Sequence, residues 1–166
     1  MPRNRRLPSN RDPRRFDLGL CATAAAKGWP DGGQWCGYFR TPGLRNVAAR
    51  ERYMHNGVFD DLRAVVAWYG TRAIEAERWY ADGVLFDDVP ARYRSNINMA
   101  SMPYSRRKGM TSALSEDDID AIVAFLQTLT DAPFEAAARK NMQAQALRRT
   151  TPVNLAVSPA PPPPTR

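Results

Sequence analysis

Residues 39–69 read FRTPGLRNVAARERYMHNGVFDDLRAVVAWY and decide the fold, because they join two chain breaks to an amphipathic helix. The TPG tripeptide at 41–43 predicts a turn, since proline fixes φ and glycine permits a positive φ. A short helix is expected over residues 44–50. The HNG tripeptide at 55–57 predicts a second break, because asparagine and glycine tolerate the left-handed conformation. Its first residue, His55, is the only histidine of the chain.

An amphipathic helix is expected to begin at Asp60 or Asp61, either of which can accept hydrogen bonds from the free amide groups of a first turn. Its apolar stripe has the i, i+3, i+4, i+7 spacing of a helix and consists of Leu62, Val65, Val66 and Tyr69. Arg63 and Trp68 lie off this stripe. On spacing alone, Tyr69 is a core tyrosine whose hydroxyl finds a partner at the edge of the fold.

The clearest helix follows Ser115, which with Asp118 approximates a capping box. Acidic residues fill its first turn, where their negative charge interacts favourably with the positive end of the helix dipole. One face is apolar and consists of Ile119, Ile122, Val123, Leu126 and Leu129. Two further helical segments are expected, one over residues 71–79 and an Ala-rich surface helix from about 131 to 149.

The remaining sequence has little periodicity. Residues 82–110 predict a long irregular excursion, which is too long for a mere connector. Residues 151–166 contain six prolines and predict a disordered tail. The chain is therefore expected to be all-α with long irregular loops. We divide it into a basic irregular arm (1–15), a helical domain (16–130), an Ala-rich helical extension (131–150) and the Pro-rich tail (151–166).

The net charge of +7 is unevenly distributed. Six arginines lie within residues 1–15, and smaller basic clusters lie at 106–108 and 148–149. No helix-turn-helix, zinc-finger or RNP pattern accompanies them, so we expect no nucleic-acid partner. A basic docking face for an acidic redox partner fits this composition better. No stretch reaches the about twenty apolar residues that span a bilayer, and no secretory signal is recognised.

Several blocks of the sequence resemble one family in order and spacing. They are FRTPGLRNVA at 39–48, YMHNGVF at 53–59, the leucine-led helix that follows, FDDVPARY at 86–93 and LSEDDIDAIVAFLQTLT at 114–130. Together they are similar to the C-terminal haem domain of the bacterial di-haem cytochrome c peroxidase and MauG family. The resemblance covers about residues 2–130 and implies that residues 16–130 form a cytochrome-c-like haem domain.

The resemblance also implies roles for individual residues. Tyr69 stands where the family has the distal axial ligand of the C-terminal haem iron, which is methionine in typical peroxidases and tyrosine in the MauG-like branch. A phenolate is a hard donor that stabilises ferric iron. His55 matches the family's interdomain histidine near the haem edge and is the candidate catalytic residue. Arg45 is a candidate haem-propionate partner. Main-chain carbonyls at Arg50 and Arg52 match a possible calcium site.

One feature departs from the family: the chain has no C-x-x-C-H motif, through which haem c is attached. Residues 2–21 resemble the stretch that follows this motif in the family. We therefore expect the motif to be encoded upstream of Met1, which would be an internal GTG valine codon read as a start. A true gene break is the rival explanation.

The two cysteines of the chain, Cys21 and Cys36, bracket a loop rich in glycine and tryptophan. The family is periplasmic, and after export a disulfide would close this loop, with a contribution of about 3 kcal/mol in the chain-entropy model. Two free buried thiols are the alternative in a cytoplasmic product, which is the expected location if the chain is truly this short.

The implied function is electron transfer and peroxide-dependent oxidation through haem c, in a peroxidase-type oxidoreductase of which this chain is a part. The expected partners are a haem-bearing N-terminal portion or separate chain, and an electron-donor cytochrome or a protein substrate. Two alternatives remain: a haem-free remnant or interaction module without redox activity, and one half of a split haem protein in which another chain supplies the haem.

Overall fold

The structure is a computed structural model, and it describes residues 11–12, 16–80 and 84–150. These parts are helical, which confirms the all-α prediction. The elements are α1 (Leu20–Ala26), η2 (Gly32–Trp35), η3 (Val47–Ala49), α2 (Leu62–Thr71), α3 (Ala76–Trp79), η5 (Ala91–Asn96), α4 (Glu116–Thr128), η6 (Ala132–Phe134) and α5 (Glu135–Thr150). The expected disordered tail, 151–166, and most of the expected basic arm, 1–15, lie outside the described residues.

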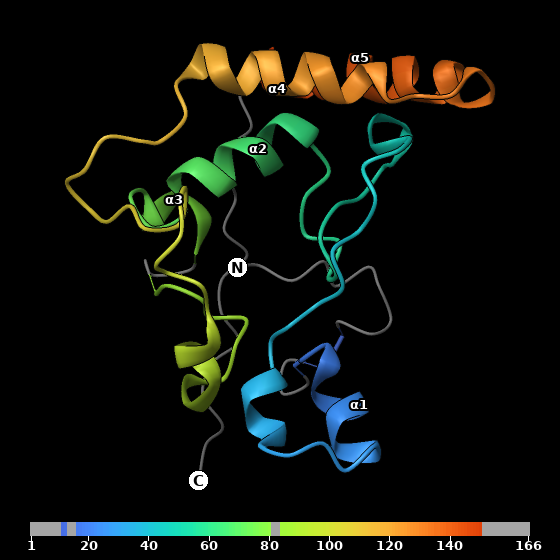
Figure 1. Ribbon diagram of the computed structural model, residues 1–166. Coiled ribbons are helices and arrows are strands. Elements are labelled where there is room, and N and C mark those ends of the chain that lie inside the picture. Colours follow the sequence, from blue (N-terminus) through green and yellow to red (C-terminus); the bar gives the residue numbers. More distant parts are fainter. Residues whose placement is uncertain (1–10, 13–15, 81–83, 151–166) are drawn as a thin grey trace, which may run out of the picture.

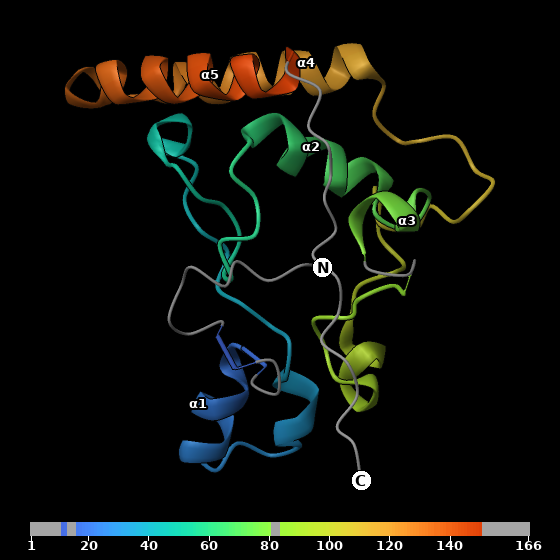
Figure 2. The same cartoon turned by 180° about the vertical axis from the view of Figure 1, so that it is seen from behind.

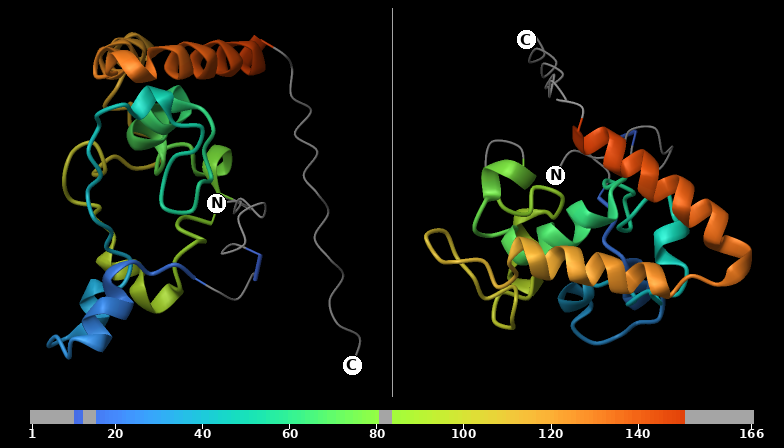
Figure 3. Two further views of the ribbon diagram at one scale, coloured as in Figure 1. Left: turned by 90° about the vertical axis from the view of Figure 1, so that its right-hand side faces the viewer. Right: turned by 90° about the horizontal axis from the view of Figure 1, so that it is seen from above.

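The helices lie in tiers. The hairpin of α4 and α5 lies at one end of the molecule, and α2 runs beneath it (Figures 1 and 2). Seen from above, α4 and α5 diverge from the turn that joins them (Figure 3, right). The opposite end is formed by α1, η2 and η5. Asn96 joins η5 to η2 and the residue after it, since its side-chain amide donates to the carbonyls of Gly33 and Cys36, both at 2.9 Å.

The core lies between α2, α4, η3 and α5. Its most buried members include Leu62 from α2 and Ile119 from α4, which are 2% and 1% exposed. Burial of such side chains is worth about 1.5–3 kcal/mol each. The rest of the core consists of Val47, Ala48, Tyr53, Val66, Ala67, Trp79, Tyr80, Val123, Leu126 and Ala138.

The first turn of α2 is capped from two directions. As predicted, an aspartate caps it: Asp61 Oδ1 accepts from the amides of Arg63 at 2.8 Å and Ala64 at 3.3 Å. Gln145 of α5, which is 1% exposed, accepts from the amide of Leu62 at 3.0 Å. Because a helix leaves its first amide groups without intrahelical acceptors, these contacts fix where α2 begins.

The capping box predicted for α4 is present. Ser115 Oγ accepts from the amide of Asp118, and Asp118 accepts in return from the amide of Ser115. The helix then packs on α2, and Arg63 of α2 donates to Asp120 and Glu116 of α4, both at 2.6 Å. The Ala-rich helix expected from about 131 is also present, as η6 and α5.

Two local predictions in the N-terminal half were wrong. Residues 41–43 form no turn, and Gly43 does not adopt a positive φ. The helix expected over 44–50 is reduced to η3, because Asn46 is left-handed with φ of 60°. Tertiary hydrogen bonds hold it there: its amide donates to Leu129 O at 2.9 Å and its Oδ1 accepts from the amide of Asp131 at 2.7 Å.

The break predicted at 55–57 is present. Met54 and Gly57 have positive φ values of 66° and 59°, and the chain folds back so that Tyr53 pairs with Phe59. The helix expected over 71–79 is only partly formed, because α2 ends at Thr71 and α3 is a single turn. Within 82–110, the described residues form only the short η5, in line with the expected irregular excursion.

Cys21 and Cys36 form a disulfide, with their Cα atoms 4.3 Å apart, which confirms the expected pairing. It joins α1 to the residue that follows η2. Within the described parts of the chain, no helix combines the length and the apolar character needed to cross a bilayer.

Replacement of Gln145 by alanine should lower the free energy of unfolding by about 1–3 kcal/mol, since the buried amide of Leu62 loses its acceptor. Urea unfolding followed by circular dichroism measures this change. Gln143→Ala, at an exposed position of the same helix, is the control and should change stability by less than about 0.5 kcal/mol. Equal effects of the two substitutions would show that the Gln145 contact contributes nothing.

Candidate functional site

Tyr69 lies on the flank of α2 and is 37% exposed, so the prediction of a buried stripe through Tyr69 was wrong. The buried residues of α2 are instead Leu62, Val66, Ala67, Gly70 and Thr71. The predicted stripe and the observed buried set share Leu62 and Val66, because neighbouring stripes of a helix overlap. The sequence spacing alone therefore does not decide which of the two is buried. The phenol is therefore available to a group outside the packed core.

Aromatic rings surround Tyr69 on its protein side. Its ring lies 5.1 Å from that of Trp68 and 5.9 Å from that of Tyr104, which belongs to the irregular excursion. Burial raises the pKa of the Tyr69 phenol, and proximity to Tyr104 adds to the rise, while Arg72 opposes it. The described residues alone therefore keep this phenol protonated at neutral pH.

Arg72 lies one helical turn after Tyr69 and is buried, with 8% exposed. Its guanidinium carbon lies 4.3 Å from the ring centre of Tyr104 and 5.1 Å from that of Trp68, and a third ring, Phe86, is 5.3 Å away. Cation–π contacts of this kind are worth up to about 2 kcal/mol when desolvated. One nitrogen, Nη2, donates to Asn98 O at 2.7 Å.

No carboxylate within residues 11–12, 16–80 and 84–150 pairs with Arg72, and its Nε has no acceptor there. Burial lowers the pKa of this guanidinium, but arginine keeps its charge at any physiological pH. A fixed positive charge thus lies beside Tyr69 and favours an anionic group there. Sequence reasoning missed Arg72 and Tyr104. The sequence offered one weak signal for each: Arg72 stands one helical turn after Tyr69, and Tyr104 lies in the long irregular excursion. Neither signal is specific for a functional site.

His55 lies apart from α2, at the chain break that precedes it. Its ring stacks on Phe39, with 3.9 Å between ring centres and 15° between planes, although the residue as a whole is exposed. Burial of the ring lowers the pKa of the imidazole, and the charges of Asp17 and Asp88 partly oppose this. The structure therefore holds a neutral imidazole on an aromatic face.

Arg45 already has an anionic partner in this structure. Its Nε and Nη2 donate to the two carboxylate oxygens of Asp131 at 2.7 and 3.0 Å, and the side chain is 79% exposed. To bind a haem propionate, as predicted, Arg45 would have to release Asp131 or bind both carboxylates at once. Asn46 also donates to Asp131, at 2.8 Å.

The predicted calcium ligands, the main-chain carbonyls of Arg50 and Arg52, lie on the strand-like stretch between η3 and the chain break. The Arg52 side chain faces Asp60 at 3.5 Å. Among the described residues no group of three or more His, Cys, Asp or Glu side chains could hold a metal ion. A site made of main-chain carbonyls would need no such group, so the calcium site stays a prediction.

Haem fits one side of this arrangement. Tyr69 offers an oxygen donor at the surface of α2, the unpaired Nε of Arg72 lies near it, and neighbouring rings supply apolar contacts. The covalent anchor does not fit, because both cysteines are joined in the disulfide and the sequence has no C-x-x-C-H. The residues present could hold an axial position of the iron and leave attachment and the proximal ligand to other sequence.

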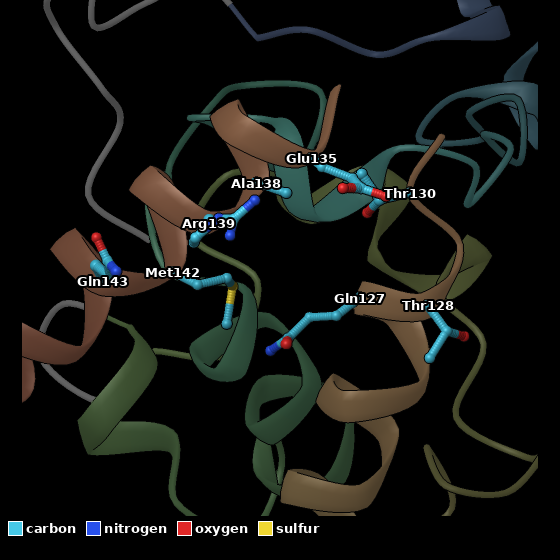
Figure 4. A pocket seen from close by; sticks show the side chains of 8 residues that line it. All are labelled: Gln127, Thr128, Thr130, Glu135, Ala138, Arg139, Met142 and Gln143. Carbon is cyan, nitrogen blue, oxygen red and sulfur yellow. The ribbon is translucent and has the colours of Figure 1, made fainter. Parts of the chain in front are cut away.

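A groove lies between α4 and α5, on another part of the surface (Figure 4). Gln127 and Thr128 line it from α4, and Glu135, Arg139 and Met142 line it from α5. None of the residues predicted from the sequence to form the site contributes to it. The groove has a mixed polar and apolar lining, and we assign it no part in the redox site.

Comparison with known proteins gives relatives for most of this domain. No family model matches the chain. The methylamine utilization protein MauG of Paracoccus denitrificans is 37% identical to it over 114 residues, which make up 66% of this chain and 27% of MauG.

Solved structures agree with this relationship. The di-haem peroxidase BthA of Burkholderia thailandensis is 58% identical and superposes with a TM-score of 0.76, and the match covers 81% of this chain and 33% of BthA. A BthA variant in which a tyrosine is replaced by methionine gives the same TM-score at 57% identity, over 81% of this chain and 32% of the variant. The chain thus spans about a quarter to a third of the length of these relatives.

The imidazole of His55 should titrate below the ordinary histidine value of about 6.5, because its ring is desolvated. A pH titration by proton NMR can follow it without assignment, since the chain has one histidine. Phe39→Ala uncovers the ring and should raise the pKa. Phe125→Ala, at an exposed position of α4, should leave it unchanged. An ordinary value in the unsubstituted chain would contradict the stacked geometry.

The Arg45–Asp131 pair should stabilise the fold only above acidic pH. Hydrogen bonds from Arg45 and Asn46 lower the pKa of Asp131, so its contribution is complete above the unfolded value of about 4 and is lost as pH falls through the lower folded value. Asp131→Asn should therefore unfold at lower urea than the unsubstituted chain at pH 6, and the difference should shrink at about pH 2.

Arg45→Gln is the matched test of the same pair. It should reproduce the loss at pH 6, and Asp131→Asn added to it should change stability little further. Independent, additive losses would show that the pair is not formed in solution.

Proposed function

Because the chain carries a domain of the MauG and di-haem cytochrome c peroxidase family, we propose that it forms the C-terminal haem domain of a peroxide-dependent oxidoreductase. The observation that carries this proposal is the position of Tyr69. It stands at the family's distal ligand position, and its phenol lies at the exposed flank of α2. The activity of the whole protein is part of the proposal, since the chain spans only part of its relatives.

Tyr69 would bind the iron of a c-type haem through its phenol oxygen, and the haem would supply one-electron redox chemistry. Arg72 supports this role, because a buried cation beside Tyr69 favours the phenolate over the phenol. Trp68 and Tyr104 restrict the ring of Tyr69 to one side of the helix. The donor oxygen is thereby held in one direction before iron is bound.

His55 would lie at the haem edge between the two haem domains and act there as a neutral group that can accept a proton. Arg45 would bind a haem propionate in competition with Asp131. Calcium would bind through the carbonyls of Arg50 and Arg52. These three roles are carried over from the family by position, and for calcium the carry-over involves main-chain oxygens alone.

The haem and its proximal histidine would come from sequence outside these 166 residues, in the same polypeptide or in a separate chain. We propose the periplasm as the place of action, in keeping with the disulfide of Cys21 and Cys36. Electrons would come from a donor cytochrome or from residues of a protein substrate.

One observation favours a second candidate. The chain contains no C-x-x-C-H, so by itself it could act as a haem-free interaction module that keeps the fold and performs no redox chemistry. The two proposals differ in whether Tyr69 can ligate haem iron that is presented to it.

A haem peptide from proteolysed cytochrome c tests this directly, because it carries C-x-x-C-H, a proximal histidine and an open axial position. Added to the purified chain, the ferric peptide should show a shifted Soret band as Tyr69 binds. Tyr69→Phe should abolish the shift, and Tyr104→Phe should keep it. No shift with the unsubstituted chain would favour the haem-free module. Equal shifts with Tyr69→Phe would remove Tyr69 from the site.

A further inference from the structure

The stretch of residues 89–115, here called the basic segment, contains five basic side chains and no aspartate or glutamate. The chain as a whole has 17 acidic residues, so their absence from this stretch separates it from its surroundings. The basic residues are Arg92, Arg94, Arg106, Arg107 and Lys108. Arg92, Arg107 and Lys108 are exposed, and the other two are half-buried.

Six arginines elsewhere in the described structure have carboxylate partners, whereas others, Arg72 and Arg139 among them, have none there. Arg63 binds Glu116 and Asp120, and Arg149 binds Asp61 through two hydrogen bonds. The other arginines paired in this way are Arg45, Arg52, Arg78 and Arg148. The charges of Arg63, Arg148 and Arg149 are therefore compensated where α2, α4 and α5 meet.

The arginines of the basic segment have no such partner among the residues that the structure describes. Arg107 donates to three main-chain carbonyls, those of Met99, Tyr104 and Arg106, at 2.7–3.1 Å. Arg94 donates to Val89 O at 3.2 Å. Carbonyl acceptors hold these guanidinium groups in place and leave their net charge uncompensated. The surface is thus positive and ordered before any partner arrives.

Two more guanidinium groups of the segment also lack a carboxylate partner among the described residues. Arg92 lies over the ring of Tyr93 at 4.8 Å, and Arg106 has a buried Nε with no acceptor in the described structure. Lys108 is the exception, since it meets Glu77 at 2.7 Å. That pair is exposed on both sides and contributes little, so a competing carboxylate can replace Glu77 at small cost.

The basic segment lies directly against the helix that carries Tyr69. Tyr104 is in ring contact with Tyr69, and Ser112 Oγ donates to Gly70 O at 3.4 Å. Gly70 permits this approach, because a Cβ there would lie 3.1 Å from Ser112 Oγ and 3.4 Å from Leu114. A partner seated on the segment would therefore lie next to the proposed ligand of the haem.

The apolar residues of the segment suit a protein partner. Met102 and Met110 are 58% and 50% exposed, and they stand on either side of the basic cluster 106–108 in the sequence. Arginine, tyrosine and methionine are the residues enriched in protein interfaces, and methionine adapts its shape to the partner. A nucleic acid would need groove-reading elements or open aromatic faces on which successive bases stack, and the two tyrosines of this segment each already carry an arginine over the ring.

We propose that the basic segment is the docking surface for an acidic face of an electron-transfer protein. This inference rests on the proposed function, since it places the partner beside Tyr69. Complementary charge would raise the rate of encounter and align the partner, and it would weaken with salt. The exposed methionines would form the small apolar centre of the contact.

A fluorescent peptide of twelve glutamates serves as the probe, with the full chain and anisotropy at low salt. Arg92→Glu/Lys108→Glu should weaken binding about tenfold, because it reverses two exposed charges of the segment. The matched control is Arg139→Glu/Lys140→Glu, which makes the same change of charge at exposed positions of α5. It should weaken binding by less than about twofold, in keeping with its distance from the segment.

Circular dichroism checks that both variants are folded, and the milder Arg92→Gln/Lys108→Gln should give an intermediate loss. NMR shifts caused by the peptide should concentrate in residues 89–115. Equal losses in the two reversal variants, or shifts spread over the molecule, would overturn the proposal. So would tighter binding of a thymidine oligonucleotide of equal charge through the same residues.

The two proposals can fail separately. Tyr69→Phe should remove the Soret shift of the haem peptide and leave glutamate-peptide binding unchanged. Arg92→Glu/Lys108→Glu should do the reverse. A loss of docking with an intact Soret shift would contradict only the surface assignment.

Discussion

The rotation of α2 about its axis is fixed at its first turn, and the rest of the site depends on it. Asp61 and Gln145 accept from successive amides of this turn, and Arg149 binds Asp61 from α5. A helix held in this way cannot turn its sides independently of α5. The apolar side packs on α4, and Tyr69 is consequently directed away from the core.

The two sides of α2 differ in how the charges of their arginines are compensated. On the side of α4 and α5, arginines such as Arg63 and Arg149 bind carboxylates and join helices. On the side of the basic segment, guanidinium groups are held by carbonyls and rings, with Arg72 the most buried among them. Pairing compensates the charges on the first side and adds little stability, since the pairs are partly exposed. The uncompensated charge on the second side favours interaction with anions, and Tyr69 lies on that side.

The helices whose ends are encoded locally could be predicted from the sequence. Ser115 and Asp61 cap their helices through neighbours a few residues away, so the pattern alone contains the information. The position of Tyr69 relative to the core could not be derived, because it depends on which side of α2 meets α4. Asn46 shows the same limit: its left-handed conformation is held by Asp131, far along the chain. The identity of Tyr69 as a ligand candidate came from resemblance, and Arg72 required the packed structure.

The disulfide between Cys21 and Cys36 affects which part of the molecule unfolds first. The end formed by α1 and η2 buries little: Ala24 is the buried residue of α1, and η2 has none. Its order therefore depends on the crosslink and on the two hydrogen bonds from Asn96. With the thiols reduced, this end would become the unit of lowest opening free energy, whereas α2, α4 and α5 would keep their shared core. Amide hydrogens of α1 would then exchange long before those of α4, so that the redox state of the surroundings sets the order of local unfolding.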